Sequence, residues 1–78
     1  MKEKDIQKII NSPQKVKFSD LDKLLQFYGY IPRQPKGGSS HFVYVKEGEQ
    51  KIITVPFKRP YVKDVYVKHI IKLLRIGE

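Results

Sequence analysis

The chain contains no cysteine, which excludes disulfides, thiolate nucleophiles and thiolate metal sites together. Histidine is nearly as scarce. The two imidazoles, His41 and His69, lie far apart in the sequence, and no set of residues has the spacing of metal ligands. We therefore expect no metal and no other cofactor.

Long hydrophobic runs are also missing. The longest apolar stretches are far shorter than a membrane span, and the charged residues 1–5 lead into no secretory apolar segment. Together with the lack of cysteine, this predicts a cytoplasmic protein that does not enter a membrane. With 78 residues, we expect one domain whose small core is held by packing alone.

Acidic residues are few, 8 against 16 lysines and arginines, and the formal net charge is +8. Such a positive balance on a small protein attracts polyanions, so it favours a nucleic acid or an acidic protein as partner. The alternative is that the lysines serve only solubility. Basic side chains crowd the last quarter of the chain: Lys58, Arg59, Lys63, Lys68, Lys72 and Arg75.

Apolar residues recur with helical spacing in three segments, which we expect to be helices: residues 5–11, 19–28 and 63–75. Ser19 is the expected N-cap of the second helix, and Asp22, three residues later, completes a capping box. Gly29 fits the position just after this helix, and Gly77 is placed to stop the third one.

Three further segments are rich in β-branched and aromatic residues and predict strands: residues 30–34, 39–45 and 51–57. Pro32 lacks a backbone donor, so the first strand should lie at an edge of the sheet. The glycine-containing connection 46–50 should join the other two as a hairpin. This order predicts an α+β fold in which helices pack on one face of a three-stranded antiparallel sheet, with an extra N-terminal helix.

His41 stands where a glycine-rich loop enters a strand, in the run Gly37-Gly38-Ser39-Ser40-His41. An imidazole exchanges protons near neutral pH, and glycines let a phosphate approach the backbone closely. The alternative is a rim histidine bonded to a backbone carbonyl. Alternation places His41 on the face opposite to Phe42 and Tyr44, but both faces are apolar, so the pattern leaves open which one meets the core.

Several short motifs follow one another in a characteristic order: Gly29 at a helix end, the run 35–41, Phe42-Val43-Tyr44, Ile53-Thr54-Val55-Pro56 and a final helix. With this order and spacing, the chain resembles the HicA toxins of prokaryotic type II toxin–antitoxin systems over about residues 18–76. The resemblance leaves residues 1–17 as an N-terminal helical extension of a single domain, 1–78.

The resemblance implies a fold like that of the double-stranded-RNA-binding domain, metal-independent cleavage of messenger RNA and neutralisation by a HicB antitoxin. The family's catalytic histidine falls on His41. Two serines separate it from Gly38 where many members have one residue, and Phe57 and Lys58 follow the Val-Pro pair where members often carry a basic residue or a histidine.

RNA carries its own nucleophile, the 2′-hydroxyl, so its cleavage needs a base, an acid and positive charge near the phosphate. We expect His41 to be the catalytic acid or base, with the second proton partner unidentified. The expected RNA- and phosphate-binding residues are Lys36, Gly37, Gly38, Ser39, Ser40, Lys58 and Arg59. The alternatives are a non-catalytic RNA-binding module of the same fold and, third, an adaptor that binds an acidic protein through the last helix.

Overall fold

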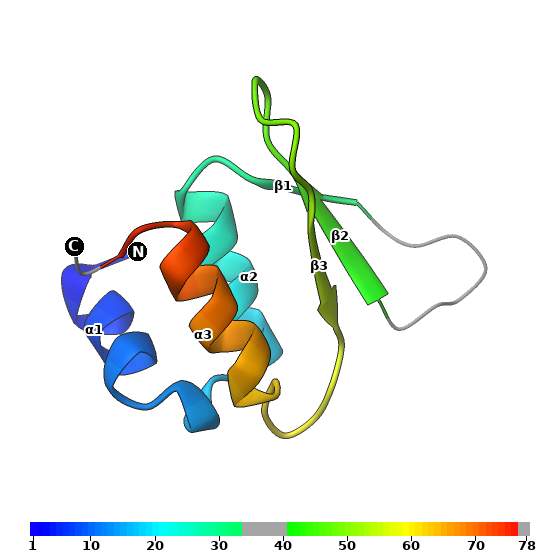
Figure 1. Cartoon of the computed structure of the whole chain (residues 1–78). Coiled ribbons are helices and arrows are strands. Elements are labelled where there is room, and N and C mark those ends of the chain that lie inside the picture. The colour runs from blue at the N-terminus through cyan, green and yellow to red at the C-terminus, as the bar shows by residue number, and fades with distance from the viewer. Residues whose placement is uncertain (34–40, 77–78) are drawn as a thin grey trace.

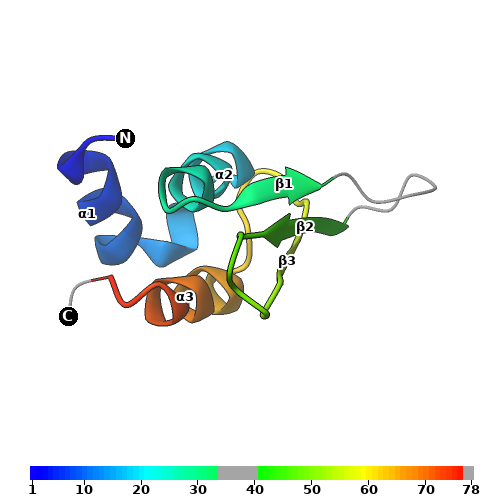
Figure 2. The same ribbon diagram turned by 90° about the horizontal axis from the view of Figure 1, so that it is seen from above.

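Three helices lie on one side of a three-stranded sheet (Figures 1 and 2). The computed structural model of the chain describes residues 1–33 and 41–76. Their elements are α1 (Glu3–Asn11), a short 3-10 helix η1 (Pro13–Lys15), α2 (Phe18–Phe27), β1 (Ile31–Arg33), β2 (His41–Val45), β3 (Ile53–Pro56) and α3 (Asp64–Leu73). The strands are antiparallel in the order β1-β2-β3. The predicted α+β class is confirmed, and the arrangement is consistent with a fold like that of the double-stranded-RNA-binding domain.

The start of α2 differs from the prediction. The helix begins at Phe18, so Ser19 lies inside it and Lys17 takes the N-cap place. The Lys17 backbone N–H donates to Oδ2 of Asp20 at 3.3 Å, so the carboxylate that stabilises this end belongs to the third helical residue. The predicted capping box of Ser19 and Asp22 is therefore wrong, and Asp22 makes a different contact, described below.

The end of α2 agrees with the prediction. Gly29 has a φ of +93°, the left-handed conformation that a residue without a Cβ adopts readily. The Tyr30 N–H donates to the Leu25 carbonyl at 3.0 Å and the Gly29 N–H to the Gln26 carbonyl, also at 3.0 Å. This is the Schellman turn that a glycine after a helix favours, and it turns the chain into β1.

Helix α3 ends in the same kind of turn, without a glycine. It stops at Leu73 rather than at the predicted residue 75, and Arg75 takes the left-handed conformation with a φ of +56°. The Ile76 N–H donates to the Ile71 carbonyl at 3.1 Å. The prediction that Gly77 stops the helix concerns a residue outside the described ones, and the described turn is complete before it.

The sheet confirms the edge position of Pro32, which lies in β1 opposite Tyr44. In the hairpin, Gly48 has a φ of +81° and the Glu49 N–H donates to the Lys46 carbonyl at 3.0 Å. The strands are shorter than predicted, with β3 covering only four of residues 51–57. The predicted strand residues 34, 39 and 40 lie outside the described part of the chain.

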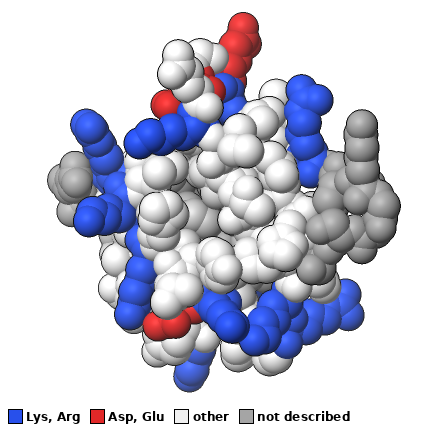
Figure 3. Space-filling view, turned by 45° about the vertical axis from the view of Figure 1, so that its right-hand side comes forward, with Lys and Arg blue, Asp and Glu red and all other residues white. Residues whose placement is uncertain are grey.

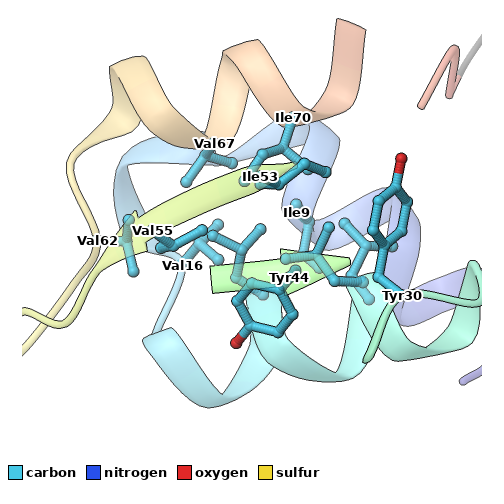
Figure 4. Close-up of a cluster of buried hydrophobic side chains, with 12 residues drawn as sticks. Ile9, Val16, Tyr30, Tyr44, Ile53, Val55, Val62, Val67 and Ile70 are labelled. Carbon is cyan, nitrogen blue, oxygen red and sulfur yellow. The ribbon is translucent and has the colours of Figure 1, made fainter. Parts of the chain in front are cut away.

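Twelve buried apolar side chains form one cluster between the helices and the sheet (Figure 4). Two of them, Ile9 and Val16, belong to the first 17 residues. The Val62 N–H, just before α3, also donates to the Val16 carbonyl at 2.9 Å. The N-terminal segment is therefore packed into the same core as the sheet and α3.

Candidate functional site

The register of the sheet decides which face carries His41. Tyr44 in β2 opposes Ile53 in β3, and both side chains are buried beneath the helices. Successive side chains of a strand point to opposite faces, and directly opposed residues share one face. His41, which opposes Pro56, therefore lies on the face that the helices leave open, and its side chain is exposed.

Five of the predicted phosphate-binding residues lie outside the described ones: Lys36, Gly37, Gly38, Ser39 and Ser40. The residues on either side of them are described. Arg33 ends β1 and His41 begins β2, and the two strands pair directly. The two described residues that flank this segment, Arg33 and His41, therefore lie at the same end of the sheet.

Arg33 is a candidate that sequence reasoning left out of the site. It opposes Val43, which lies on the same face as His41, so Arg33 and His41 are diagonal neighbours across β1 and β2. Diagonal pairs lie about 7–8 Å apart, within reach of a long side chain. The alternation along each strand tells which side chains share a face within that strand. Only the register between β1 and β2 shows that Arg33 and His41 are neighbours.

Lys58 and Arg59 follow β3 at the same end of the sheet. Pro56 in β3 opposes His41 in β2. Lys58 and Arg59, both exposed, are the second and third residues after Pro56. The Arg59 guanidinium lies over the Phe57 ring, 5.3 Å from its centroid. The structure thus brings two predicted phosphate-binding residues near His41, although they leave the sheet toward α2.

A groove of about 600 Å³ lies at this end of the molecule, lined by Lys17, Phe18, Ser19, Phe57, Lys58, Arg59 and Pro60. Two of its lining residues, Phe18 and Phe57, belong to an aromatic cluster. The Phe18 ring lies 4.9 Å from that of Phe42 and 5.0 Å from that of Phe57, centroid to centroid. Sequence reasoning did not connect residues 17–19 with 57–60, because only the tertiary fold places them side by side.

Tyr44 fastens β2 to α2 on the side of the sheet away from His41. Its hydroxyl donates to Oδ1 of Asp22 at 2.7 Å, while Gln26 Nε2 donates to the other oxygen of Asp22 at 2.8 Å. Burial, followed by the hydrogen bond and the charge of Asp22, raises the pKa of Tyr44 far above its ordinary value. The hydroxyl therefore stays protonated and holds the strand that carries His41.

The second histidine, His69, does not lie beside His41. His69 is exposed on α3, which covers the face of the sheet opposite to His41. Within residues 1–33 and 41–76, no three histidine or carboxylate side chains gather into a possible metal site. None of the described helices is long and apolar enough to cross a membrane.

Positive charge surrounds the side of the molecule that carries the sheet. Figure 3 shows lysine and arginine side chains around an uncharged centre, with acidic side chains only at the margin of the view. Such a distribution attracts a polyanion and leaves uncharged surface for it to contact.

A family model described as "HicA toxin of bacterial toxin-antitoxin" matches residues 18–76 of the chain. The match includes β2 with His41, the cations after β3 and the whole of α3. Comparison with curated proteins and with solved structures gave no match.

Proposed function

Because the chain belongs to the HicA toxin family, whose members are toxins of bacterial toxin–antitoxin systems and generally ribonucleases, we propose that it is an endoribonuclease that cleaves mRNA through His41. The observation that carries the proposal is the position of His41. It is exposed on the open face of the sheet, with Arg33 on the neighbouring strand β1 and Lys58 just after the neighbouring strand β3.

In the proposed reaction the RNA 2′-oxygen attacks the adjacent phosphorus, the bond to the 5′-oxygen breaks, and a 2′,3′-cyclic phosphate and a 5′-hydroxyl remain. One proton leaves the 2′-hydroxyl and one reaches the 5′-oxygen. His41 carries one of these transfers, since an imidazole has both a donor and an acceptor nitrogen near neutral pH. A single imidazole serves only one transfer at a time, so a second group must carry the other transfer.

The remaining groups stabilise the charge that develops on the phosphorane. In this proposal Lys36 and the backbone N–H groups of Gly37 and Gly38 contact the reacting phosphate, together with the hydroxyls of Ser39 and Ser40. Lys58 and Arg59 bind flanking phosphates. The reaction uses no metal ion, because the 2′-hydroxyl supplies the nucleophile and these cations supply the charge.

We further propose that a HicB-type antitoxin inhibits the protein and that both act in the cytoplasm. A toxin that cuts mRNA must be held inactive until it is needed, and a partner that contacts the basic sheet side would keep RNA from His41. RNA and this antitoxin are the two partners proposed for the chain.

The test is cleavage of a short single-stranded RNA in the presence of EDTA, beside the same RNA with one 2′-deoxy nucleotide at the cut. The intact RNA should be cut despite the chelator, and the 2′-deoxy bond should stay whole. Continued cleavage at the 2′-deoxy position would overturn the mechanism, and loss of cleavage with EDTA would show that a metal is required.

A non-catalytic RNA-binding module is the second candidate. The observation that favours it is the groove between β3 and α2, which presents cations and an aromatic ring without using His41. The variant His41→Ala separates the two functions, because it should abolish cleavage in an enzyme and change little in a binding module.

A further inference from the structure

The groove at the end of β3 has the composition of a nucleotide-binding site. Two walls that are distant in sequence form it: the start of α2, with Lys17 and Ser19, and the exit from β3, with Lys58 and Arg59. Phe57 lines the same groove and keeps 39 % of its surface exposed.

The Phe57 ring is held by its neighbours. One side of it contacts Phe18, and the Phe42 ring lies 6.2 Å away, centroid to centroid. The Arg59 guanidinium lies over the ring at 5.3 Å. The ring is therefore fixed in place before any ligand arrives, which lowers the entropic cost of stacking on it.

Charge selects the class of ligand. The described lining of the groove holds three cations, Lys17, Lys58 and Arg59, and no carboxylate. The nearest carboxylate along α2, that of Asp20, accepts from the Lys17 backbone and lines the hollow on the other side of the helix. That second hollow, of about 770 Å³, also contains lysines and the exposed Phe27, but Asp5 and Asp20 oppose an anion there.

We propose that this groove is a subsite for one unpaired nucleotide of the RNA substrate, next to the nucleotide whose phosphate lies at His41. The base stacks on the layer that the Arg59 guanidinium and the Phe57 ring form together, and the phosphate lies between Lys17 and Lys58. This inference rests on the proposed RNA-cleaving function and specifies its substrate as single-stranded at the nucleotide that flanks the cut.

The position of the groove fits this path. His41 opposes Pro56, and Phe57 is the next residue, so the two sites are separated only by the end of the sheet. His41 lies on the open face. Phe57 comes two residues after the buried Val55, so it points to the same side as Val55, toward the helices. An RNA strand that passes around this end reaches both, and a rigid duplex does not, because its bases are already stacked and paired.

The first experiment removes one base at a time from a short single-stranded RNA. Binding is measured with the His41→Ala variant, so that the RNA stays intact, and cleavage with the unmodified protein. An abasic nucleotide at one position beside the cut should weaken binding about tenfold, the effect expected for one stacked base, while other positions change little.

The Phe57→Ala variant should bind intact RNA about tenfold more weakly and should no longer distinguish the abasic RNA from the intact one. Phe57→Trp should restore both the affinity and the discrimination. Phe27→Ala is the matched control, since it removes an exposed phenylalanine from the other hollow, and it should leave RNA binding unchanged.

The charges are tested separately, in case Phe57→Ala does not fold. Lys17→Gln and Lys58→Gln should each reduce the slope of log affinity against log salt by about 0.7, the value for one lost phosphate contact on a single strand. Lys4→Gln, an exposed lysine on α1, is the control for net charge and should leave the slope unchanged.

The outcomes separate this inference from the function on which it rests. If no position in the abasic series affects binding, or Phe57→Ala discriminates as the unmodified protein does, the subsite is wrong while cleavage stands. If the coupling between Phe57 and one base is present but no RNA is cut, the subsite stands and the proposed reaction is wrong. Equal or faster cleavage of a fully paired duplex would also overturn the subsite.

Discussion

The two faces of β2 differ in their burial and in their proposed roles. On the face toward the helices, Tyr44 is fully buried and its hydroxyl is bound to Asp22. On the other face, His41 is exposed, and Arg33 is its diagonal neighbour on β1. The period of two along the backbone of this strand thus separates a core residue from the proposed catalytic residue. Substitutions on the two faces should therefore change different measurements.

The largest expected effect is on cleavage. His41→Ala should reduce the cleavage rate by about 100- to 10,000-fold, because it removes the proposed proton-transfer group. The free energy of unfolding should change by less than about 0.5 kcal/mol, because the side chain is exposed. Initial rates with a fluorescent RNA and urea denaturation measure the two quantities. A large loss of stability with normal cleavage would show that His41 stabilises the fold and does not carry the reaction.

The next comparison uses two adjacent isoleucines. Ile53 is buried in the core with 5 % of its surface exposed, whereas Ile52 is 59 % exposed. Ile53→Ala should lower the free energy of unfolding by about 2–4 kcal/mol, through lost apolar contacts and the cavity that remains. Ile52→Ala should change it by no more than about 0.5 kcal/mol. Equal losses in urea denaturation would contradict the observed register.

The hydrogen bond of Tyr44 gives a smaller effect. Tyr44→Phe should cost about 1–2 kcal/mol of unfolding free energy, since it removes the hydroxyl that donates to Asp22. Activity should fall little at temperatures where the variant is folded. Asp22→Asn, which keeps an acceptor for the same hydroxyl, is the matched control and should cost less.

The same bond predicts a dependence on alkaline pH. The raised pKa means that folded Tyr44 keeps a proton that the unfolded chain loses, so its stabilisation is complete below about pH 10 and declines above it. The unfolding free energy should fall with pH more steeply than in Tyr44→Phe, by up to about 1.4 kcal/mol per pH unit. Tyr30, whose pKa is also raised by burial and by Glu49, contributes equally in both proteins. Parallel curves would contradict the raised pKa.

The smallest effect concerns the open face alone. Arg33→Gln should weaken RNA binding about fourfold at moderate salt if Arg33 contacts one phosphate of the strand beside His41. The unfolding free energy should not change, because Arg33 is exposed. Fluorescence anisotropy over a range of salt measures the effect, with Lys4→Gln as control. An unchanged salt dependence would remove Arg33 from the site.

The sequence predicts most elements of this fold because their signals are local. The spacing of Leu21, Leu24 and Leu25 gives the buried side of α2, Gly29 gives its end, and Pro32 gives the edge strand. The Ser19 cap fails because the helix begins one residue earlier, at Phe18, where Asp20 accepts the Lys17 N–H.

The candidate site was predictable only in part. Lys58 and Arg59 follow a recognisable strand end, so composition and order suffice to select them. The face of His41 and the inclusion of Arg33 depend on register, which a strand that is apolar on both faces does not specify. The pairing of Lys17 with Phe57 depends on contacts between segments about forty residues apart, which no local pattern encodes.

The hydrogen bond between the Val62 N–H and the Val16 carbonyl bears on where this protein can be cut. The family match begins at residue 18, and a version trimmed to that boundary would lose Val16, Ile9 and this bond. Val62 ends the passage that carries Lys58 and Arg59, and Val16 stands next to Lys17. The segment before the family boundary therefore helps to hold the two walls of the groove at a fixed distance from each other.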